Sequence, residues 1–268
     1  MHRRITLTLT TLLLGGLLNG CSTLRQQLGA TLVPLETEIE LGEQMAAQIE
    51  KQEKIHPNRR LQNYIREIAA PIIHHSLADR PGITYSVTVL DDPDQVNAFA
   101  LPGGFIYIYT GLLLLAENEA EVAGVLAHEI GHVVGRHSAN KLATQYGLAL
   151  LSNLALGENP NEIAQLSSQL IGAGTQARFS RDDEREADKY GVKYMIEAAY
   201  APYGLLSFFQ KMNQLEKGRQ SKMSNLLSSH PPTEERIQRI EKMIRRMGSP
   251  KEKTEAARFM NRTAVLRK

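Results

Sequence analysis

The chain has 268 residues, of which 42% are hydrophobic, and its formal net charge is +2. Such a balanced charge provides no strongly basic surface, so we expect no nucleic-acid partner. The single cysteine excludes an internal disulfide bond, and the length is sufficient for one hydrophobic core, or for a core plus an extension.

Residues 1–20 have the pattern of a secretory signal peptide. Arg3 and Arg4 precede an apolar run that is shorter than a membrane-spanning helix requires. Cys21 follows directly, and this position favours a bacterial lipoprotein that is cleaved before Cys21 and lipidated on it. Acyl chains, each contributing about 0.8 kcal/mol per buried methylene, would anchor the mature chain in a membrane. Loss of Arg3 and Arg4 on cleavage changes the net charge from +2 to 0.

The mature chain is predicted to have three parts. Residues 21–36 are polar and suit a tether, and residues 37–248 form one domain. Residues 249–268 hold six basic and two acidic residues, as expected of a solvated tail that could contact anionic lipid. At the start of the domain, two helical patterns are divided around His56-Pro57, and both indicate packing against a core.

A small sheet is predicted in the next part of the chain. Alternating apolar residues from Ile83 to Leu90 predict a strand that ends at Asp91-Asp92-Pro93. Residues 97–109 predict a strand, a turn and a second strand around Pro102-Gly103-Gly104. The expected fold class is therefore α+β: a mainly helical domain with one small antiparallel sheet.

His128, Glu129 and His132 form the pattern H-E-x-x-H inside a segment whose apolar residues recur at the helical period. Residues four apart on a helix lie about 40° apart around its axis, so both imidazoles can bind one zinc ion. Glu129 is turned roughly 100° from His128, which suits a general base that reaches a water molecule without binding the metal. The alternative is a set of surface residues on an amphipathic helix, and a third metal ligand would exclude it.

His137 is one candidate for that third ligand. Metzincins place their third histidine six residues after the second, but Ser138 occupies that position here. His137 would lie about 140° from His132 around the axis if the helix continued, and residues 136–151 do keep a helical pattern. We therefore expect His137 on the helix surface or behind the metal ligands.

Glu184 is the better candidate. It precedes Asp188 by four residues, so one helix face offers a carboxylate for the metal and a second that can hold a ligating histidine by its other ring nitrogen. Two histidines, one glutamate and a water molecule form an established type of catalytic zinc site. Alone, this segment would be the solvated start of a helix with Ser180 as its N-cap, but the H-E-x-x-H pattern favours the metal site.

Four ordered segments together carry a family resemblance: residues 97–113, 128–132, 180–188 and 230–237. They resemble the HtpX and CAAX prenyl protease family of zinc metallopeptidases, and the similarity covers residues 38–247. The membrane-spanning helices of the integral-membrane members are lacking. The chain is more similar to the soluble periplasmic branch, which includes the BepA-like and LoiP-like lipoproteins.

The resemblance implies a role for each matching residue of the metal site. One zinc ion would be held by His128, His132 and Glu184, and Glu129 would be the catalytic residue. In this family the His230-Pro-Pro segment returns to the zinc ion. His230 would there stabilise the transition-state oxygen or cap the metal as a gate.

The resemblance also implies supporting and substrate-binding residues. Asp188 would lie behind the ligands, and Arg236 would help to position His230. An extended peptide would pair with the edge of the sheet through main-chain hydrogen bonds, and an ordinary core hairpin is the alternative. The implied substrate-binding residues are Asn97, Ala98, Phe99 and Ala100. The apolar stretch from 144 to 174 is expected to form two helices that cover the active site.

The implied function is a zinc endopeptidase, anchored by lipid to the outer membrane of a Gram-negative cell and facing the periplasm. Ser22 follows Cys21, as in lipoproteins that are sorted to that membrane. The implied substrates are misfolded or stalled outer-membrane proteins. Two alternatives remain: a zinc-containing chaperone or assembly factor with latent or gated proteolysis, and a domain whose metal is purely structural.

Overall fold

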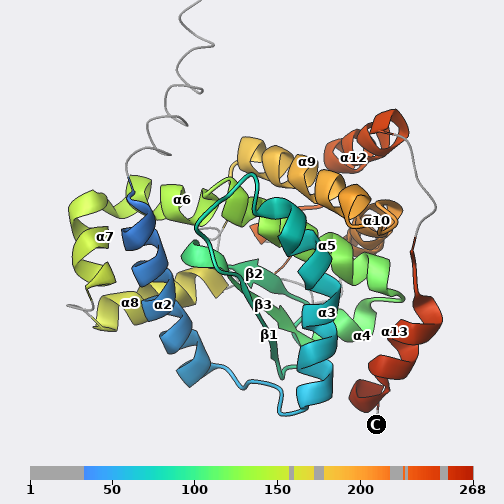
Figure 1. The fold of residues 1–268 in the computed structure, drawn as a ribbon, viewed down its shortest axis with the longest axis horizontal. Helices are drawn as coiled ribbons and strands as arrows, with labels where there is room; N and C mark the ends of the chain where they lie inside the picture. Colours follow the sequence, from blue (N-terminus) through green and yellow to red (C-terminus); the bar gives the residue numbers. More distant parts are fainter. Residues whose placement is uncertain are drawn as a thin grey trace, which may run out of the picture.

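The computed structural model describes residues 33–156, 160–171, 178–217, 226, 229–247 and 253–267. Helices and one three-stranded sheet make up this part of the chain, which confirms the expected class (Figure 1). The helices are α2 (Leu35–Gln52), α3 (Arg59–Ser76), η1 (Pro102–Gly104), α4 (Thr110–Leu115), α5 (Glu119–Val134), α6 (His137–Tyr146), α7 (Leu148–Ala155), α8 (Pro160–Ile171), α9 (Arg181–Glu197), α10 (Tyr203–Lys217), α12 (Glu234–Met247), α13 (Ala256–Arg262) and η4 (Ala264–Arg267). The strands are β1 (Ser86–Leu90), β2 (Ala98–Ala100) and β3 (Phe105–Tyr109).

The sheet is mixed, whereas the sequence predicted an antiparallel sheet. Its order is β1-β3-β2, and β3 is antiparallel to β2 but parallel to β1. The path of the chain explains this arrangement. After Leu90 the chain crosses the end of β3, so that β2 starts beside Tyr109 at the far edge, and β3 returns through η1 between the other two strands.

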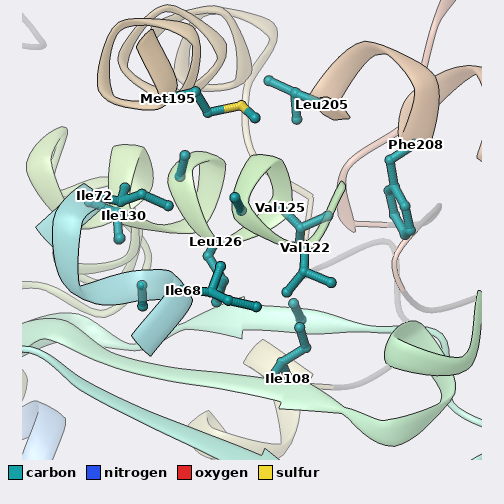
Figure 2. Packing of buried hydrophobic residues seen from close by; sticks show 14 of the residues in the cluster. Ile68, Ile72, Ile108, Val122, Val125, Leu126, Ile130, Met195, Leu205 and Phe208 are labelled. Carbon is teal, nitrogen blue, oxygen red and sulfur yellow. The ribbon is translucent and has the colours of Figure 1, made fainter. Parts of the chain in front are cut away.

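Helix α5 lies inside the larger hydrophobic core, and all of its residues are buried. Figure 2 shows Val122 and Leu126 of α5 above Ile108 of the sheet, with Met195 and Leu205 on the opposite side of the helix. These last two residues belong to α9 and α10. Helix α3 closes a third side. The helix that carries the H-E-x-x-H pattern is therefore held between packed apolar side chains of the sheet, α3, α9 and α10.

Helix α9 approaches α5 closely because position 131 is glycine. A Cβ atom on Gly131 would lie 2.8 Å from the carbonyl oxygen of Ala187, which is too close for two non-bonded atoms. Ala187 lies one turn after Glu184 in α9. This contact therefore brings Glu184 to the level of the two histidines of α5.

A second hydrophobic core lies on the other side of the sheet. There α2, α6, α7 and α8 pack against Phe99, Leu101, Tyr107 and Tyr109 (Figure 1, left). Two helices, α7 and α8, form between 144 and 174 as expected, although 157–159 and 172–174 lie outside the described residues. The described parts of α7 and α8 pack against α2 on the far side of the sheet and do not cover the active site as expected. Among the described helices, none combines the length and apolarity that crossing a membrane requires.

The two ends of the chain differ in what can be described. Residues 1–32, which include the expected signal peptide, Cys21 and most of the tether, lie outside the described residues. Residues 253–267 do not form the expected solvated tail. They form α13 and η4, with Phe259 and Thr263 completely buried. The tail was predicted from its charge alone, whereas Phe259 at the centre of α13 belongs to the larger hydrophobic core.

Candidate metal centre

Helix α5 has defined ends that place its histidines. The side-chain oxygen of Asn118 accepts a hydrogen bond from the backbone N–H of Glu121 at 3.0 Å and caps the first turn. The helix ends at Val134, and Arg136 then adopts a left-handed backbone conformation with φ 58°. The expectation of an uninterrupted helix over 136–151 is therefore wrong, because α6 starts anew at His137 and a further break follows at Gly147.

Four side chains from three regions of the chain converge beside α5. His128, His132, Glu184 and His230 each offer one donor atom, and these atoms lie within 4.8 Å of one another. The Nε2 atoms of His128 and His132 are 3.1 Å apart. Glu184 Oε1 is 3.5 Å from His132 Nε2 and 2.8 Å from Nδ1 of His230. All four side chains are buried.

This donor set suits a zinc ion. Tetrahedral coordination with metal–ligand bonds of about 2.1 Å places donor atoms about 3.4 Å apart, close to the spacings in the cluster. Imidazole nitrogen and carboxylate oxygen are also the donors that zinc prefers. Among the described residues, neither carboxylate oxygen of Glu129 accepts a hydrogen bond, although the residue is only 1% exposed. An unpartnered buried carboxylate is costly unless a cation or a polar ligand joins it.

Asp188 and Arg236 support the cluster from behind. Asp188 Oδ1 lies 3.1 Å from Nδ1 of His128, the ring nitrogen that points away from the cluster. Arg236 binds both oxygens of Asp188, at 2.7 and 3.0 Å, and its Nη1 lies 2.6 Å from Glu184 Oε2. Nη1 also donates to the carbonyl oxygen of Pro231 at 3.0 Å, which fixes the segment that carries His230. The guanidinium group of Arg236 thus joins Glu184 to Asp188, and Asp188 in turn contacts His128.

Burial and neighbouring charges set the protonation of these groups. Burial lowers the pKa of His128, but the carboxylates of Asp188 and Glu184 outweigh it and raise this pKa to about 9. Burial lowers the pKa of His132 well below its ordinary value. Burial raises the pKa of Glu184, yet the charges of His230 and Arg236 outweigh it, so the pKa of this carboxyl lies well below its usual range. Glu184 is therefore ionised and His132 neutral, as metal binding requires.

Glu129 differs from Glu184 in its environment. Burial raises the pKa of Glu129, and the nearby positive charges only partly oppose that rise. Its Oε1 lies 3.7 Å from Nε2 of His230. A carboxylate with a raised pKa is a stronger base, which suits proton transfer near neutral pH.

Strand β2 occupies the edge of the sheet beside α5, where the substrate strand was expected. Asn97 and the residues of β2 are buried rather than open to solvent. The carbonyl oxygen of Ala100 accepts a hydrogen bond from the hydroxyl of Ser138 at 3.0 Å, and the ring of Phe99 stacks on Tyr107. One backbone carbonyl of β2, that of Ala100, is therefore already occupied by a hydrogen bond from α6.

Two further side chains contact the predicted ligand His132. Nδ1 of His137 lies 2.9 Å from Nδ1 of His132, and the ring of Phe179 lies over His132 with the ring centroids 4.1 Å apart. The place of His137 behind the predicted ligands is one of the two that the sequence indicated, but its contact with His132 and the contact of Phe179 were not predicted. The contact of His137 depends on the left-handed turn at Arg136, and Phe179 has no partner at helical spacing. For Phe179, the sequence signal was its position directly before the Ser180 cap of α9.

The comparisons with known proteins agree with this geometry. The profile described as Peptidase family M48 matches residues 56–244. A mitochondrial metalloendopeptidase OMA1 of Schizosaccharomyces pombe is 33% identical over 181 residues, which are 68% of this chain and 52% of that protein. The metalloprotease YcaL of Escherichia coli K12 is 32% identical over 60% of this chain and 62% of its own length. A beta-barrel assembly-enhancing protease of Yersinia pestis is 29% identical over 78% of this chain and 44% of its length.

The similarity includes the elements that build the metal centre. The profile match runs from the loop before α3 into α12 and contains all four donor residues. The chain spans about half the length of these relatives, so their further segments have no counterpart in the comparison. Because the matched region is most of the described domain, the chain belongs to peptidase family M48.

Proposed function

We propose that this chain is a zinc-dependent endopeptidase that acts on misfolded or stalled envelope proteins. The observation that carries the proposal is a cluster of four buried metal donors beside the buried carboxylate of Glu129, which accepts no hydrogen bond from any described residue. A purely structural zinc site would need only the donors. A buried, basic carboxylate next to them costs desolvation energy and is explained by proton transfer.

Each residue has a proposed part in peptide hydrolysis. His128, His132 and Glu184 would hold the zinc, which supplies a Lewis acid that polarises the scissile carbonyl and lowers the pKa of water. A carboxylate oxygen of Glu129 takes the proton of the attacking water and then gives it to the leaving amine. Asp188 keeps the ring of His128 in place through Nδ1, and Arg236 holds Asp188.

His230 is proposed to control access to the metal. Its Nδ1 lies 2.8 Å from Glu184 Oε1 and 3.3 Å from His128 Nε2, so it belongs to the donor set and competes for the position that a substrate or water needs. Movement of the His230-Pro-Pro segment would open that position. After such a movement, a protonated imidazole could instead stabilise the oxygen that becomes negative in the transition state.

Strand β2 is proposed as the site where an extended peptide pairs with the sheet. It is the edge strand nearest to α5, and pairing through backbone groups would accept many sequences. Because Ala100 is already bonded to Ser138, binding would require α6 to move or would begin at Ala98. The proposed contact residues are Asn97, Ala98, Phe99 and Ala100.

The proposed location is the periplasmic face of the outer membrane, with Cys21 as the lipid-bearing residue. The sequence before Cys21 and the name of the Yersinia pestis relative, a beta-barrel assembly-enhancing protease, support this location and outer-membrane proteins as substrates. Globomycin, which blocks lipoprotein signal cleavage, should leave the precursor uncut. Cys21→Ala should release the protein from the membrane fraction.

The central experiment compares the wild type with Glu129→Gln. Both purified full-length chains are incubated with an unfolded, labelled test protein, and zinc is determined on each. We expect fragments from the wild type only and about one zinc per chain in both, because the amide cannot accept the proton but is not a ligand. Equal cleavage by both proteins would contradict the role of Glu129.

The same experiment separates the alternatives. If neither protein cleaves and both hold zinc, the chaperone-like alternative or a closed gate at His230 remains, and His230→Ala is tested next. If a chelator unfolds the domain instead of only stopping cleavage, the metal is structural.

A further inference from the structure

The second ring nitrogen of His132 has a histidine as its partner. Nδ1 of His132 lies 2.9 Å from Nδ1 of His137, and both side chains are about 2% exposed or less. At this distance one nitrogen must carry a proton and the other must accept it. Nε2 of His132 belongs to the donor cluster, and only an unprotonated nitrogen binds a metal. The proton therefore lies on Nδ1 of His132, and His137 is the acceptor.

The other ring nitrogen of His137, Nε2, faces two acidic side chains of α9. A neutral imidazole that accepts at Nδ1 carries its proton on Nε2. This Nε2 lies 3.3 Å from Glu186 Oε2 and 3.7 Å from Asp183 Oδ1. The two acidic side chains are about one third exposed. A chain of contacts thus runs from His132 through His137 to acids at the surface of the helix that also supplies Glu184.

The backbone between the two histidines is built for this contact. Arg136 adopts φ 58°, a backbone conformation that is unfavourable for residues other than glycine. This left-handed turn directs His137 back toward α5. Arg136 Nε donates to Oε2 of the buried Glu38 at 2.8 Å, which stabilises the turn. A Cβ atom on Gly135 would lie 2.3 Å from Nε2 of His137. Glycine is thus required there to leave room for the imidazole.

We propose that His137 is a positioning residue for the metal. It fixes the tautomer and the ring orientation of His132, as Asp188 does for His128, and so keeps Nε2 of His132 directed at the other donors. The inference rests on the proposed zinc site. Loss of such a supporting contact typically weakens metal binding by about 10–100-fold.

The test is the zinc affinity of the full-length chain, measured by competition with a chromophoric chelator. His137→Leu keeps bulk but removes the acceptor, and we expect about 10–100-fold weaker binding. His137→Asn places its Oδ1 near the former Nδ1 and should restore most of the affinity. His56→Leu is the matched control, because it removes a buried histidine near a carboxylate, Asp91, outside the cluster, and should bind zinc like the wild type.

A second variant tests the geometry without removing the imidazole. Gly135→Ala keeps all four donors and the His137 residue but should push the imidazole ring of His137 away from His132. The backbone itself accepts alanine, because φ of Gly135 is −71°. We expect weakened zinc binding here too. In NMR spectra of the zinc-loaded protein, a protected Nδ1–H of His132 should be present in the wild type and His137→Asn and absent in His137→Leu.

The outcomes distinguish the inference from the function it rests on. Wild-type affinity in both His137→Leu and Gly135→Ala would overturn the positioning role while leaving the zinc site intact. Weak binding by His137→Asn equal to that of His137→Leu would also overturn it, because a bulk effect would then explain the loss. A wild-type chain that binds no zinc would instead refute the proposed function.

Discussion

The buried imidazole of His128 is controlled by two carboxylates. Asp188 lies 3.1 Å from its Nδ1 and Glu184 lies 3.5 Å from its Nε2. Burial alone would lower the pKa of His128, but these two groups raise it to about 9. In the metal-free protein, charged His128 therefore contributes stability below its unfolded pKa of about 6.5, and this contribution is lost as the pH rises through about 9.

Zinc must displace that proton to bind Nε2 of His128. We expect about one proton to be released per zinc bound at pH 7, and the zinc affinity to increase about tenfold per pH unit between pH 7 and 9. Titration calorimetry in two buffers with different ionisation enthalpies measures the number of protons. Zinc binding without proton release, and with the same affinity at pH 7 and 9, would show that His128 is neutral before the metal binds.

The predicted ligands could be proposed from the sequence because helix geometry decides which side chains share a face. The pairs His128 and His132, and Glu184 and Asp188, are both four residues apart, and this spacing decides which face they share. The role of His137 could not be predicted in this way. It depends on an unfavourable φ at Arg136, and that φ is stabilised by Glu38, which lies 98 residues away in the sequence.

At the scale of elements, the site depends on how closely α9 approaches α5. Gly131 faces the backbone of Ala187, whereas Gly191 of α9 faces α5 with more space, since its nearest contact for a Cβ would be 3.4 Å, to the backbone nitrogen of His128. Both glycines lie inside helices. The two positions are therefore a matched pair with equal helix propensity and unequal room.

Gly131→Ala should separate the two helices. Alanine gains about 1 kcal/mol of helix propensity at either site, but overpacking at position 131 costs about 1–3 kcal/mol. We expect Gly131→Ala to have a free energy of unfolding at least about 1 kcal/mol below that of Gly191→Ala, and to bind zinc more weakly. Urea denaturation and chelator competition measure both effects. Equal stability and equal zinc affinity of the two variants would refute the close approach of α9.

Strand positions were predictable, but strand neighbours were not. Alternation of apolar residues identified the strand that became β1, although β1 begins only at Ser86, and the turn at Pro102-Gly103-Gly104 separated the strands that became β2 and β3. The parallel pairing of β1 and β3 depends on the chain crossing the sheet between Leu90 and Asn97. No periodic pattern records such a crossing, and a hairpin signal alone favours an antiparallel sheet.

For the whole molecule, the C-terminal segment closes the larger core. Phe259 of α13 is completely buried, and Nε of the neighbouring Arg258 lies 3.3 Å from Oε1 of Glu119 at the start of α5. The hydroxyl of Tyr64 in α3 donates to the same oxygen at 2.7 Å. Residues that are almost 200 positions apart thus meet at one buried carboxylate, and α13 contributes to the stability of the helix that carries His128 and His132.

Phe259→Ala should therefore destabilise the entire domain. Removing a buried phenylalanine costs about 3–5 kcal/mol of the free energy of unfolding. Met260→Ala is the control, because Met260 is 45% exposed and its loss should change stability by less than about 0.5 kcal/mol. Urea unfolding followed by circular dichroism compares them. Similar stability of both variants would indicate that α13 does not pack as described.

The measurement that tests the account most directly is the zinc content of the purified full-length chain and of His128→Ala, after dialysis against a weak chelator. Nε2 of His128 lies 3.1–3.5 Å from the donor atoms of His132, Glu184 and His230, so its loss affects every neighbour in the cluster. We predict about one zinc per chain in the wild type and almost none in the variant. An equal zinc content in both proteins would contradict the assignment of the metal centre to α5 and α9.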